Sequence, residues 1–167
     1  MAILCIMLSV VCLTDYRRTR IPNGMILLMI LYGAGYRYWD AGGQGVLQFF
    51  ENCILVLLLS YPLFKIGTIG AGDIKLVSVV CGYLSKQETA CFLVFSLLIS
   101  AIFSIIKLYL DGNVRERFVY FCSYIAGVYR TGRWQLYFSE KDQRRRSGIC
   151  LSGPIFISML LHAGGVY

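Results

Sequence analysis

Two short stretches, GAGDIK at residues 70–75 and DYRRTRIPN at residues 15–23, each place an aspartate at the edge of a long apolar run. An ionisable side chain at such a position in a membrane protein is costly and is usually functional. Two carboxylates that come together can share a proton, so that one acts as an acid and the other as a base on a water molecule. Asp15 and Asp73 therefore indicate the chemistry of an aspartic protease.

The composition places these stretches in a membrane protein. The chain of 167 residues is 57% hydrophobic with a mean hydropathy of +0.66, which is too apolar for a soluble domain. A membrane-spanning helix needs roughly 20 predominantly apolar residues. Apolar runs cover residues 1–14, 22–36, 46–64, 74–84, 89–110 and 148–167. We therefore predict an all-α integral membrane protein, a single domain over residues 1–167 with about six transmembrane helices.

The positive charge predicts the orientation of this bundle. The formal net charge is +7, and all Lys and Arg residues except Arg37 and Lys86 fall on one side of a six-helix arrangement. Because cytoplasmic loops are enriched in Lys and Arg, this side is expected to be cytoplasmic. The prediction is a multi-pass protein of the plasma membrane with both aspartates at the cytoplasmic face and both termini outside. The charge is thereby explained without nucleic acid as a partner.

Residues 111–147 form the one substantial polar stretch, in which basic and aromatic residues are mixed. The apolar part, residues 118–129, is too short to span a bilayer. We interpret the stretch as a cytoplasmic amphipathic segment between the fifth and sixth helices, lying on the lipid surface. A nucleic-acid-binding surface is the less favoured interpretation.

The two aspartates are predicted to differ in charge. Asp15 should lie near a helix C-terminus, which disfavours negative charge, and Asp73 near a helix N-terminus, which favours it. This predicts that Asp73 more often holds the charge and Asp15 the proton.

The neighbouring residues have expected roles in positioning a substrate. Gly70 and Gly72 lack a Cβ, which permits close approach of an extended substrate backbone. Pro22 should fix the start of the second helix, where Asn23 either caps the first turn or bonds to the loop. Lys75 is expected to anchor its helix at the membrane interface rather than take part in the chemistry.

Other ionisable and sulfur-containing residues are not expected to contribute. The seven cysteines include no C-x-x-C pair, so neither disulfides nor a zinc site is predicted, and no cofactor is expected. His162, the only histidine, falls in the outer half of the last helix, and Asp40, Glu51 and Glu88 fall on the outer side.

Taken together, the two aspartate stretches resemble the paired signatures of the type IV prepilin peptidase family, the membrane aspartic proteases of the G-x-G-D class. Six helices and a basic cytoplasmic face are also similar to that family, and SGPIF at residues 152–156 loosely resembles its C-terminal stretch. The resemblance implies that Asp15 and Asp73 are the catalytic dyad. It also implies a prepilin or pseudopilin substrate, cut at the cytoplasmic face just before its hydrophobic segment.

The chain resembles the compact members of that family, the peptidases of tight-adherence (Flp-type) pili or of archaeal preflagellins. The larger members carry an N-terminal cytoplasmic segment with cysteine pairs and an N-methyltransferase activity. Here no C-x-x-C pair exists and almost nothing precedes the first apolar run. We therefore expect cleavage without methylation.

Three alternatives remain open at this point. A proton-coupled transporter would place acidic residues across the depth of the membrane. A membrane scaffold of a pilus or secretion system would tolerate substitution of both aspartates. A presenilin-type or signal-peptide peptidase shares G-x-G-D but does not explain IPN at residues 21–23.

The charge pattern yields a test of topology. Cysteines introduced near Arg145 should be labelled from the cytoplasmic side, and cysteines near Asp40 or Tyr167 from the outside. If residues 118–129 cross the bilayer, residues 144–146 will instead be labelled from outside, and the six-helix arrangement will be wrong.

Overall fold

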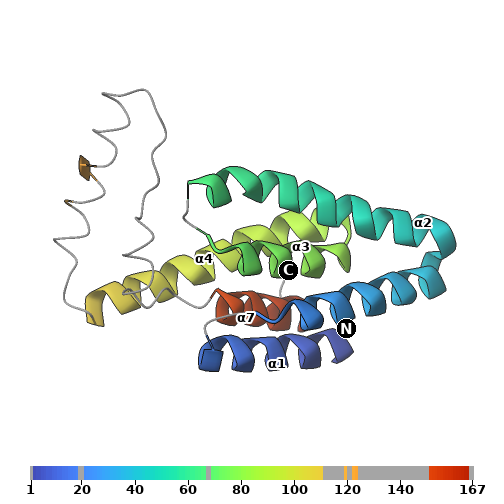
Figure 1. Cartoon of the computed structure of the whole chain (residues 1–167), viewed down its shortest axis with the longest axis horizontal. Helices are drawn as coiled ribbons and strands as arrows, with labels where there is room; N and C mark the ends of the chain where they lie inside the picture. The colour runs from blue at the N-terminus through green and yellow to red at the C-terminus, as the bar shows by residue number, and fades with distance from the viewer. Residues whose placement is uncertain are drawn as a thin grey trace.

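The structure, a computed structural model, describes residues 2–18, 21–66, 69–110, 119, 122–123 and 151–165. The main helices within this part of the chain are α1 (Ala2–Arg18), α2 (Asn23–Lys65), α3 (Ala71–Gly82), α4 (Lys86–Leu110) and α7 (Ser152–Ala163) (Figure 1). These residues contain no strand, which confirms the all-α class. The predicted amphipathic segment, residues 111–147, lies outside the described residues apart from three isolated positions.

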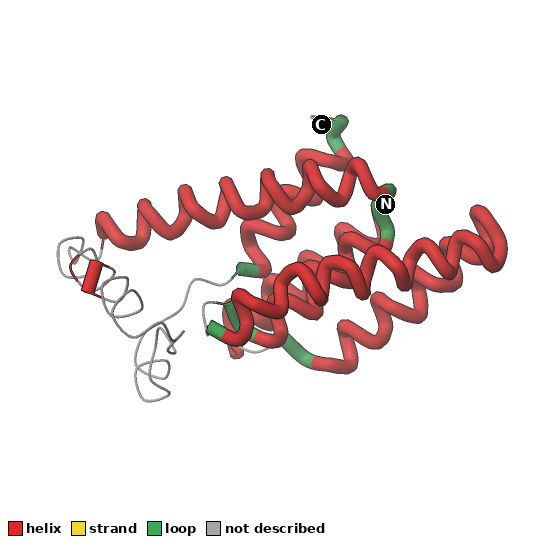
Figure 2. The backbone as a smooth tube through the Cα atoms, turned by 90° about the horizontal axis from the view of Figure 1, so that it is seen from above, coloured by secondary structure: helices red, strands yellow, loops and turns green. Residues whose placement is uncertain are grey.

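Helix α2 consists of two arms, residues 23–40 and 43–65. The helix is interrupted at Ala41 (φ −135°, ψ 16°) and Gly42 (φ 61°, ψ −147°). A positive φ of this kind is accessible to glycine at no steric cost. The chain reverses there, so that the arms form a hairpin (Figures 1 and 2). The two arms account for the apolar runs predicted at residues 22–36 and 46–64.

Helix α3 forms the centre of the bundle, with residues 76–84 all buried. A helix that is apolar on all sides is stable only when other elements surround it. Phe49, from the second arm of α2, fits against two glycines. A Cβ on Gly33 would lie 2.5 Å from the Phe49 ring, and a Cβ on Gly82 would lie 2.7 Å from it. The missing side chains thus let α3 and both arms of α2 approach closely.

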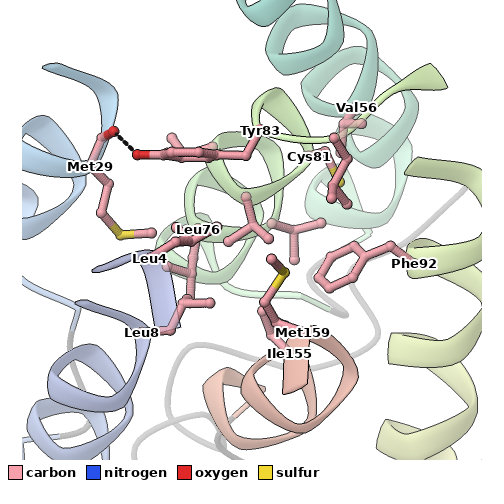
Figure 3. Close-up of a cluster of buried hydrophobic side chains, with 14 of the residues drawn as sticks. Leu4, Leu8, Met29, Val56, Leu76, Cys81, Tyr83, Phe92, Ile155 and Met159 are labelled. Carbon is pink, nitrogen blue, oxygen red and sulfur yellow. Dashed lines mark hydrogen bonds between the residues drawn. The ribbon is translucent and has the colours of Figure 1, made fainter. Parts of the chain in front are cut away.

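Buried hydrogen bonds also connect the C-terminal end of α3 to both arms of α2. The Tyr83 hydroxyl donates a hydrogen bond to the backbone carbonyl of Met29 in the first arm of α2 (Figure 3). The Asn52 side chain, in the second arm, donates to the carbonyl of Leu84 at 2.8 Å. Both partners are buried, where an unmade hydrogen bond costs free energy. These bonds therefore hold α3 between the arms.

The remaining helices complete the core around α3. Leu8 of α1, Phe92 of α4, and Ile155 and Met159 of α7 are almost fully buried and converge on one cluster with Leu76 (Figure 3). Helix α7 packs against both α1 and α4. The first and last described helices thus lie side by side (Figure 1).

Large apolar side chains cover the outside of the bundle as well. Leu58, Leu59 and Ile105 are each 65% exposed, and many neighbours on α2 and α4 are similar. Soluble monomers seldom expose contiguous apolar surfaces of this extent. In the described part of the chain, α2 and α4 are long and apolar enough to cross a membrane. Helix α3, with 12 residues, is about 18 Å long and shorter than a bilayer core. The number of crossings, six, stays a prediction.

Charged residues gather at the C-terminal end of α3. Arg37 donates to the carbonyl of Tyr83 at 3.1 Å and lies 3.9 Å from Asp40. The Lys86–Glu51 pair, at 3.5 Å, lies near the same end. The Glu88–His162 pair, at 4.0 Å, connects the first turn of α4 to the last turn of α7. These acids are therefore separated from Asp73 by the length of α3.

The packing of Phe49 predicts which glycines are essential for stability. Gly82→Ala and Gly33→Ala should each destabilise the protein by about 1–3 kcal/mol, because the new methyl group overlaps a fully buried ring. Thermal unfolding in detergent measures the effect. Gly35→Ala is the matched control, since nothing lies within 4 Å of its Cβ position. Equal stability of all three variants would contradict this account of the packing.

Candidate active site

Asp15 lies in the last turn of α1 and is only 6% exposed. It continues a stripe of buried residues, Leu4, Leu8 and Val11, at spacings of three and four. Side chains at these spacings share one face of a helix. The hydrophobic face that docks α1 onto the bundle therefore also carries the carboxylate inward.

Asp73 lies in the first turn of α3, as its place before an apolar run predicts. The backbone N–H of Gly70, the residue that caps the helix, donates a hydrogen bond to the Asp73 carboxylate. A Cβ on Gly70 would lie 3.0 Å from Asp73 Oδ2. A Cβ on Gly72 would lie 3.4 Å from Ile21, just before α2. The two glycines thus allow close packing around this carboxylate.

The two carboxylates interact with each other. Asp73 lies outside the two candidate spanning helices. Burial first, and the Asp15 charge second, raise the pKa of Asp73 from 3.8 to about 6, opposed by the Gly70 hydrogen bond. Asp73 thus retains a proton far above the usual range of a carboxyl group. Burial and the neighbouring carboxylate thus outweigh the effect of the helix N-terminus on the pKa of Asp73.

Ser152 also belongs to this site, and sequence reasoning did not single it out. Its Oγ donates a buried hydrogen bond to Asp15 Oδ2 at 2.6 Å. Ser152 is the first residue of α7, far from Asp15 in the chain. Residues 152–156 stood out in the sequence only for a loose resemblance to the family's C-terminal stretch, which gave Ser152 no role in the site.

The other predicted positions lie around the Asp73 end of α3. Pro22 precedes α2 with φ −67° and ψ 128°, and its carbonyl accepts the N–H of Met25 at 3.1 Å. Asn23 does not cap α2 with its side chain. Its Oδ1 instead accepts a hydrogen bond from the exposed Lys75 ammonium at 3.4 Å. This bond links the start of α2 to the start of α3.

A groove of about 410 Å³ begins beside these residues. Asn23 and Lys75 are part of its lining, together with apolar residues from both arms of α2, such as Ile26 from the first and Leu57 from the second. The groove is therefore almost entirely apolar, and Lys75 is the charged residue in its wall. It runs next to the helix that carries Asp73.

The arrangement suits acid–base chemistry on a water molecule. One carboxyl group that retains its proton can donate it, while the other carboxylate accepts one. Among the described residues, no group of three or more His, Cys, Asp and Glu side chains is placed to hold a metal ion.

Comparison with known proteins bears on the same residues. The sequence model of a family described as the type IV leader peptidase family matches residues 2–105, which include both aspartates. No match is found among curated proteins. None is found among solved structures.

The raised pKa of Asp73 predicts a pH-dependent stability. The folded pKa lies above the unfolded one, so this group's favourable contribution is full below about pH 4 and is lost as the pH rises through about 6. Asp73→Asn keeps an acceptor for the Gly70 N–H but carries no charge. It should be more stable than wild type at pH 8 by about 2 kcal/mol, and this gain should vanish near pH 4.

Denaturant unfolding in detergent between pH 4 and pH 8 measures this difference. Asp40→Asn is the control, because the Asp40 side chain is 59% exposed and should change stability little. An Asp73→Asn variant that is no more stable than wild type at pH 8 would contradict the pKa shift.

Proposed function

The chain belongs to the type IV leader peptidase family, as its two aspartate stretches predict, and from this premise we propose that it is a membrane aspartic endopeptidase of type IV prepilins or pseudopilins. The observation that carries the proposal is the electrostatic interaction between the buried Asp15 and the half-buried Asp73. These two carboxyl groups come from different helices, α1 and α3. Two acids that cannot both ionise are the equipment of an aspartic protease.

In the proposed reaction Asp15 is the base and Asp73 the acid. Asp15 takes a proton from a water molecule, whose oxygen attacks the scissile carbonyl carbon. Asp73 donates its proton to the carbonyl oxygen, which yields a tetrahedral gem-diol intermediate. Asp73 then takes back the proton of one hydroxyl group, while Asp15 donates the water's proton to the leaving nitrogen as the C–N bond breaks. Each carboxyl group ends in its starting state.

The surroundings of Asp73 support a substrate with an extended backbone and an adjoining apolar segment. Gly70 leaves the space beside Asp73 Oδ2 without a side chain. The apolar groove beside Asn23 and Lys75 offers a surface of matching chemistry to a hydrophobic segment. We assign Pro22, Asn23, Gly70, Gly72 and Lys75 to positioning of this substrate rather than to proton transfer.

We further propose that the protein crosses the plasma membrane several times, with the dyad at the cytoplasmic face and both termini outside. Arg17 follows Asp15 on the exposed part of α1, which agrees with a positively charged cytoplasmic end. The proposed activity is cleavage alone, of the kind found in compact peptidases of Flp-type pili or preflagellins, since the sequence holds no C-x-x-C pair.

The distribution of acids argues against the transporter alternative. Within the described residues, Asp15 and Asp73 lie at one end of α3, and Asp40, Glu51 and Glu88 lie at the other. Each acid of the second group has a cationic or histidine partner. A proton pathway would require acidic side chains between the two ends.

The dyad is tested by replacing each carboxylate with its amide. Asp15→Asn and Asp73→Asn should each reduce cleavage of a co-expressed prepilin by at least about 10²-fold, because one carboxyl group cannot serve as both base and acid. The double variant should be no worse than either single one, since the pair acts as a unit. Immunoblots of processed and unprocessed pilin, in membranes with equal enzyme levels, provide the measurement.

Asp40→Asn serves as the control and should process the pilin normally, because Asp40 lies at the opposite end of the bundle. Robust processing by either dyad variant would exclude the proposed mechanism and favour a scaffold.

A further inference from the structure

A serine outside the residues matched by the family model forms a hydrogen bond with one of the two aspartates. Ser152 lies beyond residues 2–105, yet its Oγ is 2.6 Å from Asp15 Oδ2. Both side chains are buried, Ser152 to 1% and Asp15 to 6% exposure. Because both side chains are buried, bulk water cannot take the place of the Ser152 hydroxyl. The contact therefore sets the electrostatic environment of Asp15.

The direction and length of this bond indicate which state of Asp15 it favours. The Ser152 hydroxyl is the donor and Asp15 Oδ2 the acceptor. O–H···O⁻ bonds of 2.5–2.7 Å are typical of charge-assisted pairs. A donor to the charged form of an acid stabilises that form. The Ser152 hydroxyl is therefore placed to stabilise an ionised Asp15 and to fix the orientation of that carboxylate.

The fold holds this donor in a fixed place. Ser152, Ile155 and Met159 follow one another at spacings of three and four on the buried face of α7. Ile155 and Met159 point into the core beside Leu8 of α1 (Figure 3). The packing that docks α7 against α1 therefore also aims the first residue of α7 at the carboxylate in the last turn of α1.

Among the residues that the structure describes, no charged group takes the place of this donor at Asp15. From α3 the facing group is Asp73, which repels a charge. On α1 itself Arg17 is exposed. The start of α2 contributes Asn23, which bonds to Lys75. Among the described residues of α7 the titratable side chain is His162, which lies 4.0 Å from Glu88 at the far end of the bundle.

We propose that Ser152 is a positioning residue of the dyad, which keeps Asp15 ionised and oriented as the water-activating base while Asp73 keeps the proton. This inference rests on the proposed function. To the proposed function it adds a residue outside the family match, which supports Asp15 in its role as the base. Ser152 itself exchanges no proton with the substrate.

The test is the pH dependence of cleavage by the purified full-length enzyme in detergent, with a purified Flp-type prepilin as the probe. In Ser152→Ala the donor is lost, so the pH at which the cleavage rate falls on the acidic side (the acidic limb) should rise by about one unit. At a pH below this limb, the cleavage rate should be about tenfold lower than in wild type, with little change in KM. Ser152→Thr keeps the hydroxyl and should restore the limb. Ser152→Cys, whose thiol is a weaker donor, should lie between.

Ser158→Ala is the matched control. Ser158 is a buried serine of the same helix, but its hydroxyl donates to the carbonyl of Phe92 at 3.4 Å, away from the dyad. It should leave the acidic limb in place. A limb that is identical in wild type and Ser152→Ala, or that moves equally in Ser158→Ala, would overturn the proposal, and unfolding midpoints of all variants show that each is folded.

A second measurement separates this inference from the proposed function. The infrared carboxyl band that Asp15→Asn abolishes reports protonation of Asp15 without any substrate. It should grow in at a higher pH in Ser152→Ala than in wild type. An unshifted band would refute the positioning role even if cleavage is observed. A shifted band in an enzyme that cleaves no prepilin would support the hydrogen-bonding role and refute the peptidase.

Discussion

Burial of α3 on all sides is the constraint on which the rest of the structure depends. A 12-residue helix contributes little stability alone, so its position is determined by what surrounds it. Phe49, fitted between Gly33 and Gly82, and the buried Tyr83 hydroxyl fix its C-terminal end. With that end fixed, the rigid helix determines where its first turn lies. The depth of Asp73 is therefore set by packing at the opposite end of α3.

The same packing places two acids in competition for one proton. Asp15 lies at the end of a buried stripe on α1, and the half-buried Asp73 lies at the start of a buried helix. Burial and the charge of Asp15 both raise the pKa of Asp73, so this group keeps its proton to a higher pH than an exposed carboxyl group. The local partners differ: a backbone N–H contacts Asp73, and a hydroxyl contacts Asp15. Difference in environment, rather than in residue type, separates an acid from a base.

The sequence allowed the helices, and the positions of the two aspartates at helix ends, to be predicted because both depend on local patterns. Apolar runs match the described helices, with α2 carrying two of them, and the position of Asp73 before a run places it in a first turn. The raised pKa of Asp73 could not be predicted, since the helix dipole is visible in the sequence but burial and the proximity of two acids are not. Ser152 was missed for the same reason, because its partner lies 137 residues earlier.

The long separation between Ser152 and Asp15 has a consequence for how the site is completed. Helices α1, α2 and α3 contain both acids, but the hydroxyl donor arrives with the last described helix. Without α7, Asp15 would lose its hydrogen-bond donor, and the core would lose Ile155 and Met159. The packing of α7 that completes the core thus also brings in the hydrogen bond to the proposed base, and the proposed mechanism would couple activity to completion of the fold.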